Sequence, residues 1–275
     1  MSEAIRVGVI GLGEAGTLIA EGLREAGAQL AAFDPAVREH PSIAIAASVD
    51  EVVDGALVVL SLNSSTASVK VALQVAPLLA PGAIFADLNT GTPALKRKLA
   101  GMFADDAFAD VAIMKPVPGL AEQVPMGVAG PAAQRFIELL TPFGMNLEYV
   151  SEVPGEAAAR KLIRSILAKG MAGVVIDCLW AAQSMGLHDW AYDEILREFD
   201  ESTSATAQRY VTGTAQHVKR RQIEMMDVVE MLRDTGYDST MVAAIETNYS
   251  RILHGKAIPF SKTPGQPGAR GARAQ

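Results

Sequence analysis

The sequence of 275 residues has little of several things that would point to particular functions. Its single cysteine, Cys178, allows no internal disulfide, and we interpret it as a buried packing residue in a reducing compartment. Lys and Arg number 24 against 31 Asp and Glu, and no uninterrupted apolar run is long enough to span a bilayer. These features argue against nucleic-acid and membrane partners. Since a strand-like run begins within a few residues of the N-terminus, we expect no signal peptide and a cytoplasmic location.

The sequence also lacks a cluster of metal ligands. Its four histidines are scattered, at positions 40, 188, 217 and 254, and a lone histidine is more often structural or solvated than a ligand. We therefore expect no metal. Because the net charge is −7, an anionic substrate would have to be attracted by a local cluster of cations.

The opening segment is the most informative part of what is present. A β-branched run leads directly into Gly11, Leu12, Gly13, Glu14, Ala15 and Gly16, and a helix-forming stretch follows to position 26. A strand, then GxGxxG, then a helix is the order of a dinucleotide-binding turn. Gly11 would permit the tight turn, and Gly13 would let a pyrophosphate approach the backbone. Gly16 would let the helix pack closely on the strand. The helix N-terminus would offer its free N–H groups to the phosphates.

An acidic residue, Asp34, follows about twenty positions later, at the end of the next apolar run. Its carboxylate would accept hydrogen bonds from the ribose hydroxyls and would repel a 2′-phosphate, which favours NAD. NADP stays open as the second possibility, because Arg38 would meet a 2′-phosphate if the loop folds back.

Strands and helices alternate through the first half of the chain, which predicts an α/β fold with a doubly wound parallel sheet. The expected helices, after the one that follows the glycines, are 66–79, 93–101 and 131–140. The expected strands are 5–10, 30–33, 43–45, 56–62, 83–88, 108–112, 127–129 and 147–150. Ligands bind at the carboxyl ends of such strands. We therefore expect Asn63 and Thr90, in the loops after two of these strands, to lie near the cofactor.

From residue 153 the pattern is helical alone, with expected helices at 154–185, 190–199, 202–233 and 239–254. We predict a dinucleotide-binding domain over 1–152, an all-helical domain over 153–258 joined to it by the long first helix, and a disordered tail over 259–275. Trp180, Met185 and Trp190 are interpreted as core rather than as pocket walls.

Several cations gather on the first half of the long helix. Lys161, Ser165 and Lys169 recur every four residues and so share one row, with Arg160 and Arg164 beside them. Two interpretations stay open. The row is either an ordinary solvated face, or it holds a lysine that exchanges a proton with a substrate while its neighbours hold an anionic group.

Three segments together resemble the β-hydroxyacid dehydrogenase superfamily, which includes 3-hydroxyisobutyrate and 6-phosphogluconate dehydrogenases. They are residues 9–16, 87–93 and 155–161. Residues 161–170 resemble, more narrowly, the branch labelled phosphogluconate dehydrogenase NAD-binding protein. The resemblance implies a Rossmann domain, an all-helical domain, an active site between them and a homodimer.

The same resemblance assigns roles to single residues. Lys161 falls on the family's catalytic lysine, and Ser165 stands where the family has an asparagine. Asn89 replaces the family's serine. Residues 110–119 depart from the family's substrate loop and lack the serine and glycines that hold the substrate carboxylate, and Lys115 is our candidate replacement.

We therefore predict an enzyme, an NAD(P)-dependent oxidoreductase that acts on the CH–OH group of a small, anionic hydroxy acid or a related alcohol. Lys161 would be the general acid and base with Ser165 beside it, and Lys115, Arg164 and Lys169 would bind the substrate. Two alternatives are an imine reductase, which commonly has an acid or a tyrosine at the position of Lys161, and a dinucleotide sensor without catalysis.

Overall fold

The computed structural model describes residues 5–64 and 66–258 of the chain. Contacts divide the chain into two compact units, with the division after Ile166. This division falls within α6 (Glu156–Ser184), the long helix expected from the sequence. The predicted disordered tail, 259–275, lies outside the described residues.

The first unit is built on a seven-stranded sheet with the order β2-β1-β3-β4-β5-β6-β7. Its strands are β1 (Arg6–Ile10), β2 (Gln29–Phe33), β3 (Val58–Ser61), β4 (Ile84–Asp87), β5 (Phe108–Ile113), β6 (Met126–Ala129) and β7 (Leu147–Ser151). The first five run parallel, but β6 is antiparallel to β5, and β7 is parallel to β6. The expectation of a wholly parallel sheet is therefore wrong for β6 and β7. The chain between β5 and β6 holds only the 3-10 helix η1 (Ala121–Gln123), without the crossover helix that parallel neighbours need.

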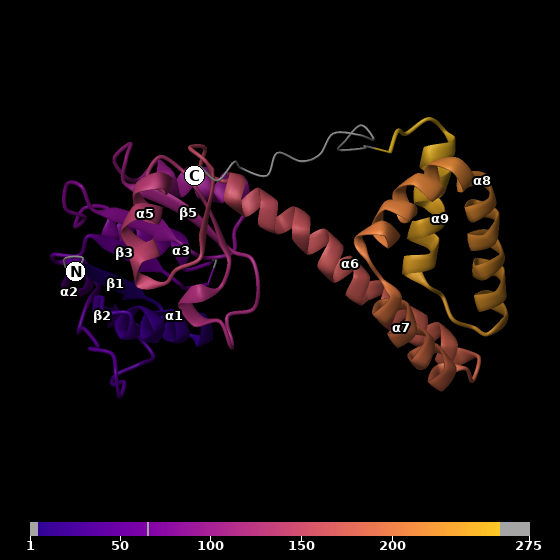
Figure 1. Cartoon of the computed structure of the whole chain (residues 1–275), viewed down its shortest axis with the longest axis horizontal. Helices are drawn as coiled ribbons and strands as arrows, with labels where there is room; N and C mark the ends of the chain where they lie inside the picture. Colours follow the sequence, from indigo (N-terminus) through magenta and orange to yellow (C-terminus); the bar gives the residue numbers. More distant parts are fainter. Residues whose placement is uncertain (1–4, 65, 259–275) are drawn as a thin grey trace, which may run out of the picture. The chain divides into compact units, whose positions relative to one another are not determined.

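Helices cover both faces of this sheet (Figure 1), which confirms the doubly wound α/β fold. One face packs on α1 (Glu14–Glu25) and α5 (Ala133–Leu140). The other packs on α2 (Val49–Val53), α3 (Ser68–Val75) and α4 (Pro93–Ala100). Successive side chains of a strand point to opposite faces, so neighbouring residues of β3 pack against the helices on opposite faces of the sheet. A strand buried on both sides is apolar throughout, as the sequence indicates here.

Two short segments differ from the sequence prediction. Residues 43–45 form only an isolated bridge, from Ile45 to Ala32, in place of the expected strand. Helix α2 was not predicted; it has five residues, too few to show helical periodicity, and begins where the side chain of Ser48 accepts a hydrogen bond from Glu51 N. A second 3-10 helix, η2 (Thr141–Phe143), continues from α5.

The second unit consists of the rest of α6 with α7 (His188–Glu201), α8 (Ser204–Asp234) and α9 (Thr240–Leu253), the last two packed side by side (Figure 1). A polar contact ties α6 to the start of α9. The buried Asp177 carboxylate accepts hydrogen bonds from Ser239 and, at 2.6 Å, from the Tyr237 hydroxyl. This hydrogen bond stabilises the protonated phenol and, with burial and the carboxylate charge, raises the pKa of Tyr237 to about 12.

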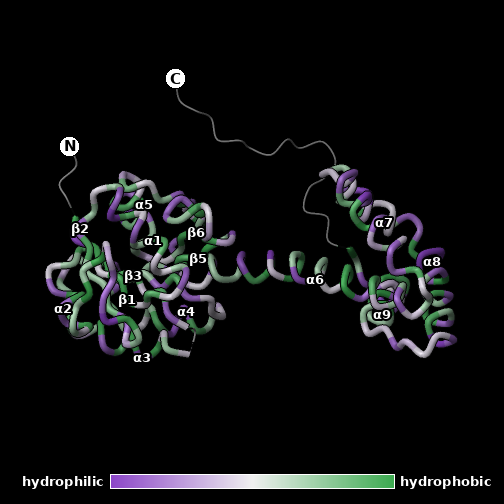
Figure 2. Tube along the Cα trace, turned by 90° about the horizontal axis from the view of Figure 1, so that it is seen from below, coloured by the Kyte–Doolittle hydropathy of each residue, from purple (hydrophilic) through white to green (hydrophobic). Residues whose placement is uncertain are grey.

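The expected core residues of this unit are at its surface. Cys178 is exposed, and so are Trp180, Met185 and Trp190, so the prediction that they are buried is wrong. Cys178, Met185 and Trp190 line an apolar cavity of about 420 Å³ within the unit. Figure 2 shows hydrophobic residues interspersed with hydrophilic ones along these helices, and the helices of this unit leave many of the apolar side chains exposed. Within the described residues, none of the helices has the length and apolarity that a membrane crossing requires.

Candidate active site

The glycine turn lies where β1 ends and α1 begins. Gly11 has φ +104°, and a Cβ there would overlap the Leu62 carbonyl, so only glycine fits. A Cβ at Gly16 would overlap the Gly11 carbonyl oxygen, so Gly16 lets α1 approach the turn. Gly13, the N-cap, is exposed and has no atom within 4 Å of its Cβ position. The space next to Gly13 is thus open at the N-terminus of α1, and the free N–H groups of a helix N-terminus suit a phosphate.

Asp34 lies directly after β2 and is linked to this turn. Its Oδ2 accepts a hydrogen bond of 2.8 Å from Leu12 N, and its Oδ1 accepts one of the same length from Ala36 N. The chain then reverses, with a bridge between Asp34 and Val37, before the exposed Arg38. The half-buried carboxylate is therefore held at the edge of the glycine turn, where the ribose of a dinucleotide would lie.

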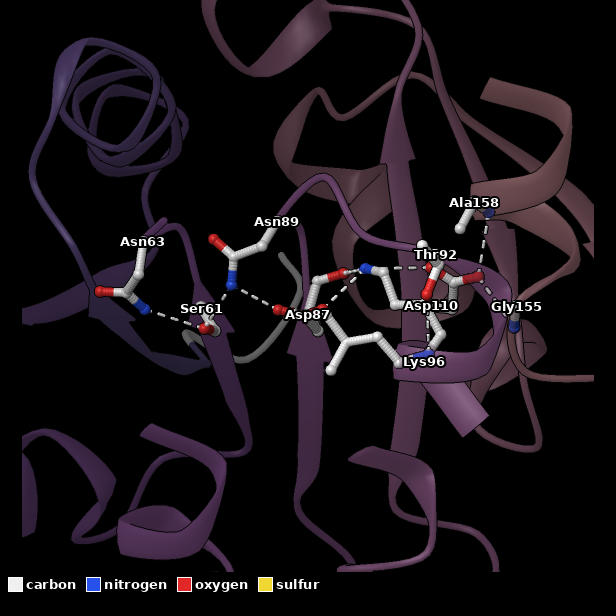
Figure 3. Close-up of polar contacts among 10 residues, drawn as sticks. Ser61, Asn63, Asp87, Asn89, Thr92, Lys96, Asp110, Gly155 and Ala158 are labelled. Atoms are coloured by element: carbon white, nitrogen blue, oxygen red, sulfur yellow. Dashed lines mark hydrogen bonds and ion pairs between the residues drawn. The ribbon is translucent and has the colours of Figure 1, made fainter. Parts of the chain in front are cut away.

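The carboxyl ends of β3 and β4 carry a chain of polar side chains (Figure 3). Ser61, at the end of β3, pairs in register with Ile10 of β1 and with Asp87 of β4. Its Oγ accepts hydrogen bonds from Asn63 Nδ2 at 2.9 Å and from Asn89 Nδ2 at 3.0 Å. Asn63 thus lies between the glycine turn and Asn89, at the point where the strand order reverses.

A buried ion trio lies beside these amides. Lys96 of α4 is 1% exposed, and its Nζ lies 2.7 Å from Asp87 Oδ2 and 3.1 Å from Asp110 Oδ1. It also donates to the Asp87 carbonyl oxygen, at 2.7 Å. Asp87 is the last residue of β4 and is paired in register with Asp110, which lies within β5. One ammonium group therefore compensates two buried carboxylates.

Asp110 connects this trio to α6. Its Oδ2 accepts hydrogen bonds from Gly155 N at 3.0 Å and from Ala158 N at 3.1 Å (Figure 3). These are N–H groups at the helix N-terminus, where a negative charge is stabilising. The carboxylate thereby fixes the first turn of α6, and Lys161 follows in the next turn.

A narrow pocket of the first unit brings several of these residues together. Its lining consists of Asn89, Thr90, Gly91, Lys96, Asp110, Val111, Ala112, Ala158, Lys161 and Leu162. Lys161 and Thr90, both predicted site residues, thus meet in one place. Ser165 is half-buried one turn further along α6 and is not part of this lining.

The other predicted site residues lie outside that lining. Lys115, after β5, and Arg164, on α6, are exposed, and Lys169 is exposed in the second unit. Around the glycine turn, Glu14 is exposed, Leu12 is buried and Ala15 is half-buried. Among residues 5–64 and 66–258, no group of three His, Cys, Asp or Glu residues is placed to hold a metal ion.

Sequence reasoning missed the role of Lys96. Lysine is almost never buried unless it is paired, and nothing in its local sequence distinguishes it from the exposed Arg97 and Lys98 beside it. A signal was present in the strands, because the apolar runs of β4 and β5 each contain an aspartate. Two buried aspartates on adjacent strands require a cation.

Family comparison agrees with this architecture. Residues 6–128 match the model described as the NAD binding domain of 6-phosphogluconate dehydrogenase. Residues 182–252 match a domain of unknown function, DUF1932. The two matches fall on the two units of the chain.

Several proteins are similar over most of the chain. A conserved hypothetical protein from Sinorhizobium meliloti 1021 is 32% identical, with 94% of this chain and 92% of that one covered and a TM-score of 0.59. An imine reductase from Myxococcus stipitatus in complex with NADP⁺ is 15% identical, with coverage of 92% and 95% and a TM-score of 0.76. An uncharacterized protein from Methanothermus fervidus is 23% identical over 62% of this chain, an alignment that spans 66%, just under two thirds, of that protein.

Proposed function

Because the chain belongs to the β-hydroxyacid dehydrogenase superfamily, we propose that it interconverts a small hydroxy acid or related alcohol and its carbonyl compound with NAD(P). The observation that carries this proposal is the pocket in which Lys161 lies beside Asn89 and Thr90. Those two residues follow β4, at the sheet edge where the glycine turn also lies. A proton-exchanging group beside a dinucleotide site is what alcohol oxidation requires.

Each part of the site has a separate task in this proposal. The N–H groups of the first turn of α1 bind the pyrophosphate, Asp34 accepts hydrogen bonds from the ribose, and Asn63 and Thr90 lie toward the nicotinamide. The nicotinamide supplies hydride transfer when it is bound. Lys161 removes the hydroxyl proton during oxidation and returns it during reduction, and Ser165 orients that lysine. Lys115, Arg164 and Lys169 provide the positive charge for an anionic substrate.

Imine reduction is the second candidate, since the fold is shared with imine reductases over 92% of this chain. An absorbance assay for reduced nicotinamide separates the candidates. Small hydroxy acids, sugar acids and polyols are offered with NAD⁺ and NADP⁺, and cyclic imines with NADH and NADPH. Turnover of an alcohol supports the proposal, and turnover of imines alone replaces it. Tight binding of NADH with no turnover in either panel would favour a sensor.

We expect Asp34→Ala to weaken NAD⁺ binding about tenfold or more, because two charge-assisted hydrogen bonds to the ribose are lost. Binding of NADP⁺ should improve, since the repulsion of the 2′-phosphate is removed and Arg38 follows the chain reversal. Titration calorimetry with both cofactors measures the ratio of the dissociation constants for NAD⁺ and NADP⁺. In the matched double variant Asp34→Ala/Arg38→Ala, the gain for NADP⁺ should be smaller, because the contribution of Arg38 is lost. An unchanged ratio in the single variant would exclude Asp34 as the selective residue.

The functional form is, we propose, a homodimer. Ile163, Ile166 and Leu167 of α6 are 68%, 74% and 66% exposed, and many large apolar side chains of α7 and α8 are exposed as well. So much exposed apolar surface is typical of an interface. Light scattering should give twice the mass of the chain, and Leu167→Asp should shift the protein toward monomer. The exposed Ala168→Asp serves as a control for an added charge alone. A native protein of monomeric mass at micromolar concentration would refute the dimer.

A further inference from the structure

The side-chain amide of Asn89 has one orientation available to it. Asn89 is 5% exposed, and its Nδ2 donates to Ser61 Oγ and to Asp87 Oδ1. Lys96 Nζ lies 2.7 Å from the other oxygen of that carboxylate, so Asp87 faces donors on both of its oxygens and acts as the acceptor. Turning the amide over would place Oδ1 against the carboxylate. The ion trio thereby fixes the NH₂ group toward Asp87.

This orientation leaves an acceptor without a partner. Asn89 Oδ1 is buried, has no hydrogen-bond donor among the described residues, and points away from Ser61 and Asp87 (Figure 3). Asn89 also lines the pocket that contains Lys161. Buried amide oxygens are nearly always paired, so the missing donor is expected from a bound molecule.

The charge beneath the pocket acts in the same direction. Within the buried trio, the two carboxylates of Asp87 and Asp110 face the one ammonium group of Lys96, so the trio itself has a net charge of −1, and Lys161 lines the same pocket. A carboxylate or phosphate oxygen next to Asn89 would meet both an acceptor and this negative charge. A hydroxyl, amine or amide would meet a matched partner.

We propose that Asn89 is a specificity-determining residue whose Oδ1 accepts a hydrogen bond from an O–H or N–H group of the bound ligand. The ligand group next to Oδ1 is therefore a donor, and the anionic part of a hydroxy acid lies elsewhere. This inference rests on the proposed function. Two sources can supply the donor, the carboxamide of the nicotinamide and a hydroxyl or amine of the substrate.

Paired ligands distinguish these sources without turnover. NAD⁺ is compared with its 3-acetylpyridine analogue, in which a methyl group replaces the carboxamide NH₂. Protein saturated with NADH is then offered 2-hydroxypropanoate against 2-methoxypropanoate, and glycerol against its trimethyl ether, with binding followed by ligand-observed NMR. In one of these two comparisons, cofactor or small molecule, we expect native protein to bind the ligand that has the donor group about five- to tenfold more tightly than the ligand that lacks it. This difference in affinity is the effect of one hydrogen bond. Asn89→Leu should remove that preference.

Asn89→Ala serves as a second variant if Asn89→Leu is unfolded by thermal melting, because it removes the acceptor without adding a larger side chain. A preference that persists in the folded variant overturns the proposal, and so does equal binding of the paired ligands by native protein in both arms. Failure of native protein to bind NAD⁺ or NADH at all would instead refute the proposed function.

Discussion

Lys161→Ala should lower the turnover number at least about a hundredfold, while the dissociation constant for NADH should change by less than about twofold. General acid and base catalysis by a positioned side chain contributes about 10²- to 10⁴-fold, and alanine leaves no group to exchange the proton. The cofactor contacts proposed above come from the glycine turn, Asp34, Asn63 and Thr90, and none comes from α6. The loss should therefore fall on kcat rather than on cofactor binding.

The measurement needs the substrate that the absorbance screen identifies, followed by steady-state kinetics and a fluorescence titration with NADH. Lys98→Ala is the matched control, because Lys98 is exposed on α4 and does not line the pocket. It should retain native turnover. If Lys161→Ala turns over as fast as native protein, Lys161 has no part in proton transfer, and the family's assignment does not hold for this chain.

The parts of the site that the sequence predicts are those determined by local chemistry. Gly11 and Gly16 are required by backbone conformation and close approach, and both constraints act within a few residues. Asp34 directly follows the apolar strand β2, at the expected distance from the turn. Strands buried on both faces and long helices also leave periodic patterns, so their positions are predicted well, with ends that differ by a few residues.

The parts that the sequence did not predict depend on contacts between distant segments. Lys96, Asp87 and Asp110 are brought together by the register of β4 and β5 and by the packing of α4. Strand β6 runs antiparallel to β5 because of the connection between the two strands. Hydrophobic periodicity in the sequence does not indicate the direction in which a strand runs. The surface positions of Trp180 and Trp190 could not be predicted either, because a hydrophobic face on a helix does not indicate whether the same chain or another one covers it.

Lys96→Met should lower the free energy of unfolding by about 3–5 kcal/mol, the usual effect of removing one partner from a buried ion pair. Methionine fills a similar volume, so the loss comes from Asp87 and Asp110, which remain buried without a cation. Urea unfolding measures this change, and the exposed Arg97→Met on the same helix should stay within about 0.5 kcal/mol of native protein.

A triple variant separates charge from packing. Lys96→Met combined with Asp87→Asn and Asp110→Asn has no buried charge in the trio and should recover a large part of the lost stability. Hydrogen exchange at the amides of Gly155 and Ala158 should be faster in Lys96→Met, because Asp110 caps α6 through these groups. If the single variant is as stable as native protein, the trio does not hold α6 in place. The position of Lys161 in the pocket would then depend on the packing of Ala157 and Ala158, which are buried in the first turn of the same helix.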